Sequence, residues 1–346
     1  MKLELYCTVG RGLLPLCTEE LKQLGIHVSH SIEGKIFFTI SKKEQCPQLK
    51  SAERLLVCAY HGYLTNDITN KAATAFKLQR LLAEQINWSD HIRTWRLFHP
   101  DAPSGPLPFR ANVRLSGQFR RILQPLRVSR SFGQRVASTE GHVLQPCVRN
   151  PIVVIDIHVS DEHVTVGIAL TGLCSPALGG ASHGLRSTTA SAMVICLGPL
   201  PPASVILDPM CGKGSLLYEV PEHCFKIGID IDESQLLQAK QNVRTSNLIF
   251  GDARNMPLKS KSIDHVVCDL PFGLQYSSLS ELETLLPSVL LEIKRVIKHS
   301  ATIVLLTSME QLPFLTKCIN NTWSCKNKFP ISLGALEAVI SVYSNI

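Results

Sequence analysis

The 346-residue sequence lacks any long hydrophobic run. Its apolar stretches, such as residues 152–157 and 303–306, have the length of β-strands, whereas a membrane-spanning helix needs about 18 or more apolar residues. An acid, Glu4, stands near the start, and no signal-peptide apolar region follows it. We therefore expect no membrane association and no secretion, and a location in the nucleus, the cytoplasm or both.

Metal-ligand spacing is also lacking. The twelve cysteines occur singly between Cys7 and Cys325 and never form a CxxC pair, which argues against a zinc knuckle and a thioredoxin-type motif. The histidines show no ligand spacing either. We predict that the chain binds no metal and that its cysteines serve as small buried hydrophobic residues in a reducing compartment.

Charged residues are scarce at 18% of the chain, yet the net charge is +7. The excess of Lys and Arg lies before residue 186 and is concentrated in residues 110–149, where Glu140 is the only acid. The arginines of this segment are Arg110, Arg114, Arg120, Arg121, Arg127, Arg130, Arg135 and Arg149. Such a cluster is typical of a protein that binds a polyanion, and the alternative is a solvated helix face. We predict that these eight arginines bind RNA.

The first half of the chain has the pattern of an α+β fold. We expect strands at residues 3–8, 35–40, 109–115, 152–158 and 163–170, and helices at residues 15–24, 49–60, 71–86 and 125–139. The Gly- and Ser-rich residues 171–184 indicate a hinge.

From Arg186 onward, strands and helices alternate. We expect strands near residues 204–208, 225–230, 247–251, 264–269, 301–307 and 335–344, and helices at residues 187–197, 233–245 and 281–298. This alternation predicts an α/β fold with a doubly wound, mostly parallel sheet, in which ligands bind at the carboxyl ends of the strands.

A turn with two glycines follows the first of these strands. It contains Asp208, Pro209, Cys211, Gly212 and Gly214. The glycines let the backbone turn sharply and approach a ligand, although a dinucleotide site would show the same pattern. A carboxylate at the strand end suits the cationic amino acid end of S-adenosylmethionine, whereas it would repel a pyrophosphate. We therefore assign these five residues to cofactor binding.

Acids also stand at the ends of the next two strands. Asp230, and second to it Asp232, are expected to bind the ribose hydroxyls, and Asp252 with Ala253 the adenine. Each acid alone would more often be a helix cap or a turn residue. Acids at three successive strand ends favour the cofactor interpretation.

The fourth strand ends in the tetrapeptide Asp269, Leu270, Pro271 and Phe272. A base amino group is a poor nucleophile, because its lone pair is delocalised into the ring. A carboxylate and a backbone carbonyl that accept its two hydrogens would stabilise the charge that develops during methylation. Pro271 would stiffen the corner, and Phe272 would stack on a flipped-out base. We predict that these four residues are catalytic, the alternative being a proline turn with a core phenylalanine.

Several segments of the sequence resemble the THUMP-domain guanosine methyltransferases. They are CTVGRGL at 7–13, GKIFF at 34–38, KSAER at 50–54, RNP at 149–151, GLRST at 184–188, DPMCG at 208–212 and DLPFG at 269–273. The resemblance spans nearly the whole chain. It implies a ferredoxin-like unit at residues 1–68, a THUMP RNA-binding domain at 69–172 and a Rossmann-like methyltransferase domain at 173–346.

The resemblance further implies an S-adenosylmethionine-dependent enzyme that forms N2-methylguanosine in structured RNA, with U6 small nuclear RNA as the implied substrate and tRNA as the broader target of the family. It also implies a heterodimer with a small zinc-binding activator protein. An apolar strand at residues 247–250, expected at the sheet edge, would suit such a partner. Two alternatives stay open: an adenine amino methyltransferase, and an inactive RNA-binding scaffold.

Overall fold

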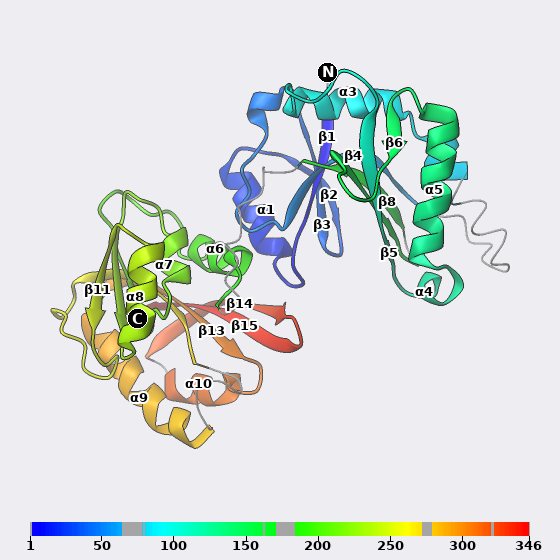
Figure 1. Ribbon diagram of the computed structural model, residues 1–346. Helices are drawn as coiled ribbons and strands as arrows, with labels where there is room; N and C mark the ends of the chain where they lie inside the picture. Colours follow the sequence, from blue (N-terminus) through cyan, green and yellow to red (C-terminus); the bar gives the residue numbers. More distant parts are fainter. Residues whose placement is uncertain are drawn as a thin grey trace. The chain divides into compact units, whose positions relative to one another are not determined.

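The computed structural model describes residues 2–63, 78, 80–161, 163–170, 184–271, 279–319 and 322–345. By its internal contacts the chain divides into two compact units, each with its own β-sheet (Figure 1). Unit 1 comprises residues 1–8, 25–48 and 54–174, and unit 2 comprises residues 9–24, 49–53 and 175–346. Among the described residues, no helix is long and apolar enough to span a membrane.

Unit 1 is built on an eight-stranded sheet in the order β2-β3-β1-β4-β8-β7-β5-β6. Its strands are β1 (Leu3–Thr8), β2 (Val28–Ile32), β3 (Lys35–Ile40), β4 (Arg54–Gly62), β5 (Leu107–Leu115), β6 (Leu144–Pro146), β7 (Val153–Val159) and β8 (Val164–Ala169). Its helices are the short η1 (Lys43–Gln45) and η2 (Leu81–Gln85), then α3 (Trp88–Phe98), α4 (Phe119–Ile122) and α5 (Pro125–Glu140). Residues 71–77 and 79 of the predicted helix at residues 71–86 lie outside the described residues, and the described remainder is helical at 78 and 80 and in η2.

One face of the unit 1 sheet is covered by α5. The residues of β7 alternate between buried and half-buried, as expected for a strand with one covered face. On the covered face the ring of Phe109 from β5 meets the ring of Phe132 from α5 edge-on, with 5.8 Å between centroids. Residues 110, 112 and 114 of β5 therefore lie on the opposite face of the sheet.

The expected helix at residues 49–60 is wrong, because residues 54–62 form strand β4. β4 lies between β1 and β8 in the interior of the sheet, and four consecutive residues are buried, so both of its faces are covered. Leu55, Leu56, Val57 and Cys58 are all buried in succession. A continuous apolar run of this kind does not distinguish a fully buried strand from a buried helix.

Unit 2 contains a seven-stranded sheet in the order β11-β10-β9-β12-β13-β15-β14. Its strands are β9 (Val205–Asp208), β10 (Phe225–Asp230), β11 (Ser246–Phe250), β12 (Ile263–Asp269), β13 (Ile297–Ser308), β14 (Trp323–Leu333) and β15 (Leu336–Asn345). Its helices are α1 (Leu14–Gln23), α6 (Ser187–Ile195), α7 (Ser215–Glu219), α8 (Glu233–Asn242), α9 (Leu279–Val296) and α10 (Leu312–Ile319). The pairings among β9 to β13 are parallel, and β15 pairs antiparallel with β13 and β14.

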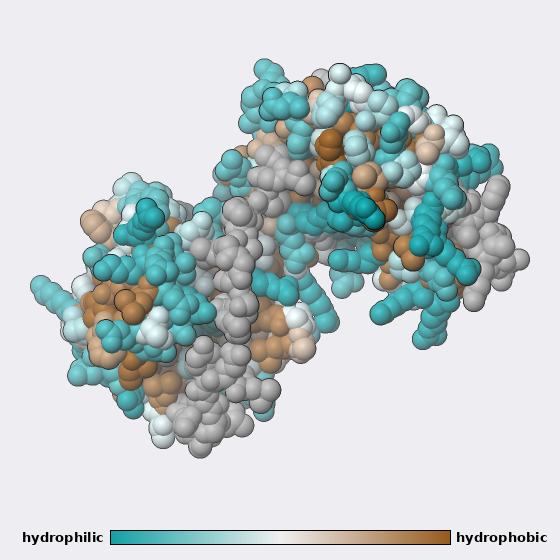
Figure 2. Space-filling model, in the orientation of Figure 1, coloured by the Kyte–Doolittle hydropathy of each residue, from teal (hydrophilic) through white to brown (hydrophobic). Residues whose placement is uncertain are grey.

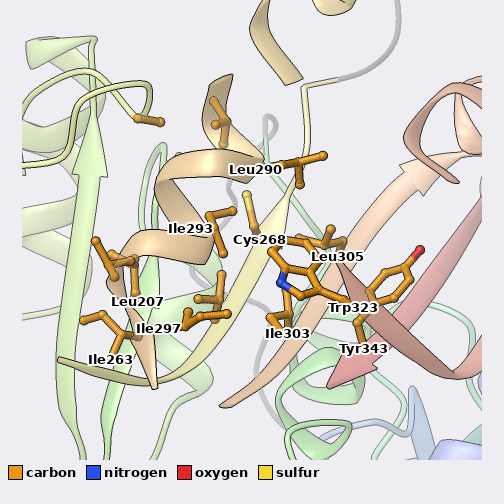
Figure 3. Packing of buried hydrophobic residues seen from close by; sticks show 14 of the residues in the cluster. Leu207, Ile263, Cys268, Leu290, Ile293, Ile297, Ile303, Leu305, Trp323 and Tyr343 are labelled. Carbon is orange, nitrogen blue, oxygen red and sulfur yellow. The ribbon is translucent and has the colours of Figure 1, made fainter. Parts of the chain in front are cut away.

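Apolar cores lie on both faces of this sheet, as the doubly wound pattern predicts. On one face Leu305 of β13 packs with Ile293 of α9, in the cluster drawn in Figure 3. On the other face the next residue of the strand, Leu306, belongs to a cluster that includes Met193 of α6. Both faces of β13 are thus covered at this point, which explains the apolar run at residues 303–306.

Two features of unit 2 differ from the alternation of strands and helices that the sequence predicts from residue 186 onward. Helix α1 begins after only thirteen residues of the chain, yet Leu13 and Leu16 pack in the same core cluster as Met193. The expected single strand at residues 335–344 is one arm of a hairpin, whose other arm β14 was missed. β14 is an edge strand in which only Trp323 and Ile331 are buried, so it carries no clear alternation of apolar and polar residues.

Candidate active site

A cavity of about 850 Å³ opens where β9, β10, β11 and β12 end at their carboxyl edge. Its size is in the usual range for a small-molecule site. The predicted site residues that line it are Asp208, Pro209, Cys211, Gly212, Asp230, Asp232, Asp252, Ala253, Asp269, Leu270 and Pro271. The structure therefore brings together residues that are more than sixty positions apart in the sequence.

The glycine turn after β9 has the tight backbone that its sequence predicts. Gly212 and Gly214 have φ angles of 50° and 80°, a left-handed conformation that other residues adopt at a cost. A Cβ atom at Gly214 would also lie 3.0 Å from a methyl of Val243. Gly214 does not line the cavity, but it sets the close packing of the turn onto α8. The turn leads directly into α7.

Asp208 ends β9 and is almost completely buried. One carboxylate oxygen accepts a hydrogen bond of 3.3 Å from the backbone N–H of Met210. Burial raises the pKa of Asp208 well above its usual range, and the neighbouring carboxylates of Asp269 and Asp230 raise it further. A cationic group in the cavity would relieve this repulsion, so the position fits the ammonium end of S-adenosylmethionine.

Asp230 and Asp232 each hold part of the backbone around the cavity. Asp230 accepts from the backbone N–H groups of Gly212 at 2.7 Å and of Asp232 at 2.9 Å. Asp232 caps α8 by accepting from Ser234 N at 2.8 Å, and the Ser234 hydroxyl holds its pKa below the usual range. The alternative interpretation of such an acid was a helix cap. Asp232 does cap α8, and it also lines the cavity.

Asp252 is engaged by a residue that the sequence motifs did not mark. The guanidinium of Arg254 donates to both of its oxygens, at 2.9 Å from Nε and 2.6 Å from Nη2 to Oδ2 and at 3.1 Å from Nε to Oδ1. These hydrogen bonds hold the pKa of Asp252 below its usual range. Arg254 also lines the cavity. A basic residue two positions after the acid was the available signal.

Asp269 ends β12 and has the most distinctive environment of the site. Its Oδ1 is shielded from solvent and has no hydrogen-bond partner within the described part of the chain. Burial raises the pKa of Asp269 to about 7. The next residue, Leu270, donates its backbone N–H to Leu306 O at 3.0 Å, which ties the corner to β13. The fourth predicted residue, Phe272, lies outside the described residues.

Other parts of unit 2 complete the cavity wall. Leu185 precedes α6, Leu285 belongs to α9 and Leu333 ends β14. Leu185 belongs to the GLRST segment of the family resemblance, whereas no motif in the sequence marks Leu285 and Leu333, because they reach the cavity through the packing of distant elements. Among the described residues, no group of His, Cys, Asp and Glu side chains could hold a metal ion.

The eight predicted RNA-binding arginines lie in unit 1, and all are exposed. Helices α4 and α5 carry Arg120, Arg121, Arg127, Arg130 and Arg135, and Figure 2 shows mainly hydrophilic side chains over these helices. Arg110 and Arg114 lie on the sheet face opposite α5. The guanidinium of Arg135 pairs with Glu84 at 2.5 Å, whereas the other seven make no ion pair with the residues that the structure covers. The structure thus divides the cluster between two surfaces.

A doubly wound sheet, a glycine turn and carboxylates at four successive strand ends define a class: a Rossmann-like methyltransferase. Asp208 is buried, and one oxygen of Asp269 has no hydrogen-bond partner in the described part of the chain; these two carboxylates fit a cationic cofactor.

The comparisons with known proteins place the chain more closely. Residues 178–338 match the family described as UPF0020: RMKL-like, methyltransferase domain. The chain is 27% identical, over 88% of its length and 78% of the relative, to the U6 snRNA (guanine-N(2))-methyltransferase THUMPD2 of Bos taurus. It is 29% identical, over 55% of its length and 42% of the relative, to the tRNA (guanine(6)-N(2))-methyltransferase THUMP3 of Homo sapiens.

Among solved structures, TrmN from Thermus thermophilus has the same fold, with a TM-score of 0.76 and 19% identity over 99% of this chain and all of that one. The α/β fold class with a Rossmann-like sheet is confirmed. So are the resemblance found in the sequence motifs, the assignment as an enzyme and the use of S-adenosylmethionine.

Proposed function

We propose that the chain transfers a methyl group from S-adenosylmethionine to the 2-amino group of guanosine in structured RNA. The observation that carries this proposal is the Asp269 carboxyl, which lines the cofactor cavity with one oxygen shielded and without a hydrogen-bond partner among the residues that the structure describes. An acceptor in that state is suited to a donor that arrives with the substrate, such as an amino group. The guanine-N2 specificity of the two relatives supports the same choice of base.

In this proposal the cofactor is held by the glycine turn and by the acids at the strand ends. Asp208 would lie at its ammonium end, Asp230 and Asp232 at its ribose, and Asp252 with Ala253 at its adenine. When bound, the cofactor supplies an electrophilic methyl group on a sulfonium. The chain contributes binding and orientation, in a cavity whose wall combines buried apolar residues such as Leu216 and Leu270 with the buried carboxylate of Asp208.

Asp269 would act directly on the substrate. Its ionised carboxylate accepts a hydrogen bond from the guanine amino group, while a backbone carbonyl of the Asp269–Pro271 corner accepts the second hydrogen. The amine lone pair would form the new bond to the methyl carbon as the bond from that carbon to sulfur breaks and its electron pair stays on sulfur; nitrogen would become positive, and the carboxylate would stabilise that charge. The amine then loses one proton, and a carboxyl with a pKa of about 7 is suited to receive it. Phe272 would stack on the base.

Unit 1 would bind the RNA substrate. We propose that residues 1–68 and 69–172 are the ferredoxin-like and THUMP domains, ahead of the methyltransferase domain at 173–346. The exposed arginines between 110 and 149 supply positive charge for phosphate contacts. The relative with the longer matched segment acts on U6 snRNA, which makes this RNA the first candidate substrate and tRNA the second. A U6 substrate would place the protein in the nucleus, and a tRNA substrate in the nucleus or the cytoplasm.

We also propose a small zinc-binding activator protein as partner. Strand β11 is an edge of the unit 2 sheet and has one free side. Phe250 ends β11, Ile231 follows the neighbouring strand β10, and Leu237 belongs to α8. Each of these three side chains is more than 60% exposed. Figure 2 shows an apolar area over β11 and α8. An added strand from a partner would satisfy the edge and cover these side chains.

Nucleoside mass spectrometry tests the activity. Purified chain, alone and with the activator, would be incubated with U6 snRNA or tRNA and with S-adenosylmethionine carrying a labelled methyl group. The expected product is labelled N2-methylguanosine. Labelled N6-methyladenosine would establish the adenine alternative instead. If no label is transferred and calorimetry detects no cofactor binding, the chain is an RNA-binding scaffold and the proposal is wrong.

A further inference from the structure

A buried carboxylate ties together two elements of the cofactor cavity. Glu219 is the last residue of α7, the helix that follows the glycine turn. One of its oxygens accepts a hydrogen bond of 2.5 Å from the hydroxyl of Ser187, the first residue of α6. Just before α6, Gly184 and Leu185 line the cavity. Glu219 therefore links the helix after the glycine turn to the wall segment before α6.

The other oxygen of Glu219 needs a counter-ion. The side chain is 1% exposed, and its Oε2 makes no hydrogen bond with the residues that the structure describes. Its ion-pair partner is the half-exposed ammonium of Lys50, 3.6 Å away. A buried carboxylate without such a partner would be costly.

Lys50 is itself held in place by helix α1. The buried carboxylate of Glu20 accepts the backbone N–H of Lys50 at 2.7 Å and that of Ser51 at 3.0 Å, and it also binds the Ser51 hydroxyl. Leu16, on the same helix, packs in the core cluster that contains much of α6. The segment 49–53 is thus fixed within unit 2 although it lies far from the cavity in sequence.

We propose that Lys50 and Glu219 are positioning residues for S-adenosylmethionine: their ion pair keeps the start of α6, and with it the cavity wall at Gly184 and Leu185, in the conformation that binds the cofactor. A part of the chain that precedes the RNA-binding arginines therefore contributes to cofactor affinity without touching the cofactor. The inference depends on cofactor use alone and not on the identity of the RNA.

Binding of S-adenosylhomocysteine to the full chain, measured by calorimetry, tests the proposal. Lys50→Met removes the charge and keeps most of the aliphatic stem, and we expect the Kd to rise about 5- to 10-fold, with kcat at saturating cofactor within about twofold. Lys50→Arg should restore the affinity. Lys22→Met is the matched control, because Lys22 forms an exposed pair with Glu19 at 3.8 Å, and it should leave the Kd unchanged.

A double-mutant cycle separates positioning from a general effect on the fold. Glu219→Gln keeps an acceptor for Ser187 and removes the buried charge, so Lys50→Met should have little further effect in that background. Equal effects of Lys50→Met in both backgrounds, or an unchanged Kd in the single variant, would overturn the proposal. If Lys50→Met does not fold, Ser187→Ala keeps both charges and should still raise the Kd about threefold. An unchanged Kd there would be equally decisive.

Discussion

Replacement of Asp269 by asparagine should lower activity and raise stability at the same time. The pKa of Asp269 is about 7 in the folded chain, against 3.8 for an unburied aspartate. Only the ionised form can accept the amine hydrogen and its charge, so the wild-type rate should rise about tenfold per pH unit up to pH 7 and then level off. Asp269→Asn should lose about 100- to 1000-fold in kcat, the usual scale for one preorganised group, and lose this pH dependence.

For an ordinary paired carboxylate the free energy of unfolding rises with pH, whereas for Asp269 it should fall. Between pH 3.8 and pH 7 the folded chain keeps a proton on Asp269 that the unfolded chain has released. The free energy of unfolding therefore falls as pH rises, by about 1.4 kcal/mol per pH unit, and the full loss of about 4 kcal/mol is reached above pH 7. Asparagine is neutral throughout and avoids this loss.

Denaturant unfolding at pH 5 and pH 8 measures the difference. From pH 5 to pH 7 the wild type should lose about 3 kcal/mol relative to Asp269→Asn, and above pH 7 the gap should stay constant. Asp264→Asn is a control on the same strand, because Asp264 pairs with Lys298 at 2.6 Å and its loss should cost stability at both pH values. A gap that is equal at pH 5 and pH 8, with a wild-type rate that is flat across pH 7, would refute the reasoning.

Two further predictions concern the proposed partners. Replacing Arg120, Arg121 and Arg127 by glutamate should weaken RNA binding. It should also reduce the magnitude of the slope of log K against log salt by about one for each phosphate that the protein no longer neutralises, as measured by filter binding across a salt series. An unchanged slope would mean that these residues form a solvated helix face. Phe250→Asp should abolish co-purification with the activator. Leu291→Asp is the control, because Leu291 is 68% exposed on α9, and it should leave co-purification unchanged. If the Phe250 variant still co-purifies, the partner binds at another surface.

The line of acids along the cavity could be predicted because it follows from local patterns and one general rule. Parallel strands present their carboxyl ends at the same edge of a sheet, so residues that follow each strand must meet there. Asp208, Asp230, Asp252 and Asp269 do lie at or just after the ends of β9, β10, β11 and β12. Strand order was not needed for this prediction, since any order of parallel strands brings these ends to one edge.

The rest of the site depends on packing that no local pattern encodes. Leu333 reaches the cavity because β14 and β15 form a hairpin, and β14 itself was not predicted since its exposed residues follow no regular alternation. In the sequence, Glu20 is an ordinary helix acid and Lys50 an ordinary surface lysine. Their role became apparent only because the structure places α1 in unit 2. A basic residue two positions after Asp252 was a signal in the sequence, but it did not suffice to assign Arg254, because only geometry distinguishes a guanidinium that binds Asp252 from one in solvent.

The acids at the strand ends also show that a backbone role and a cofactor role are compatible. Asp230 accepts one backbone N–H on each oxygen, and each carboxylate oxygen has a second lone pair that can still accept a ribose hydroxyl. The two backbone contacts fix the plane of the carboxylate before any ligand arrives, so little side-chain entropy is lost on binding. The same hydrogen bonds that make Asp230 look like a turn residue therefore prepare it to bind the cofactor, and removing its carboxylate should disturb the turn at Gly212 as well as the ribose contact.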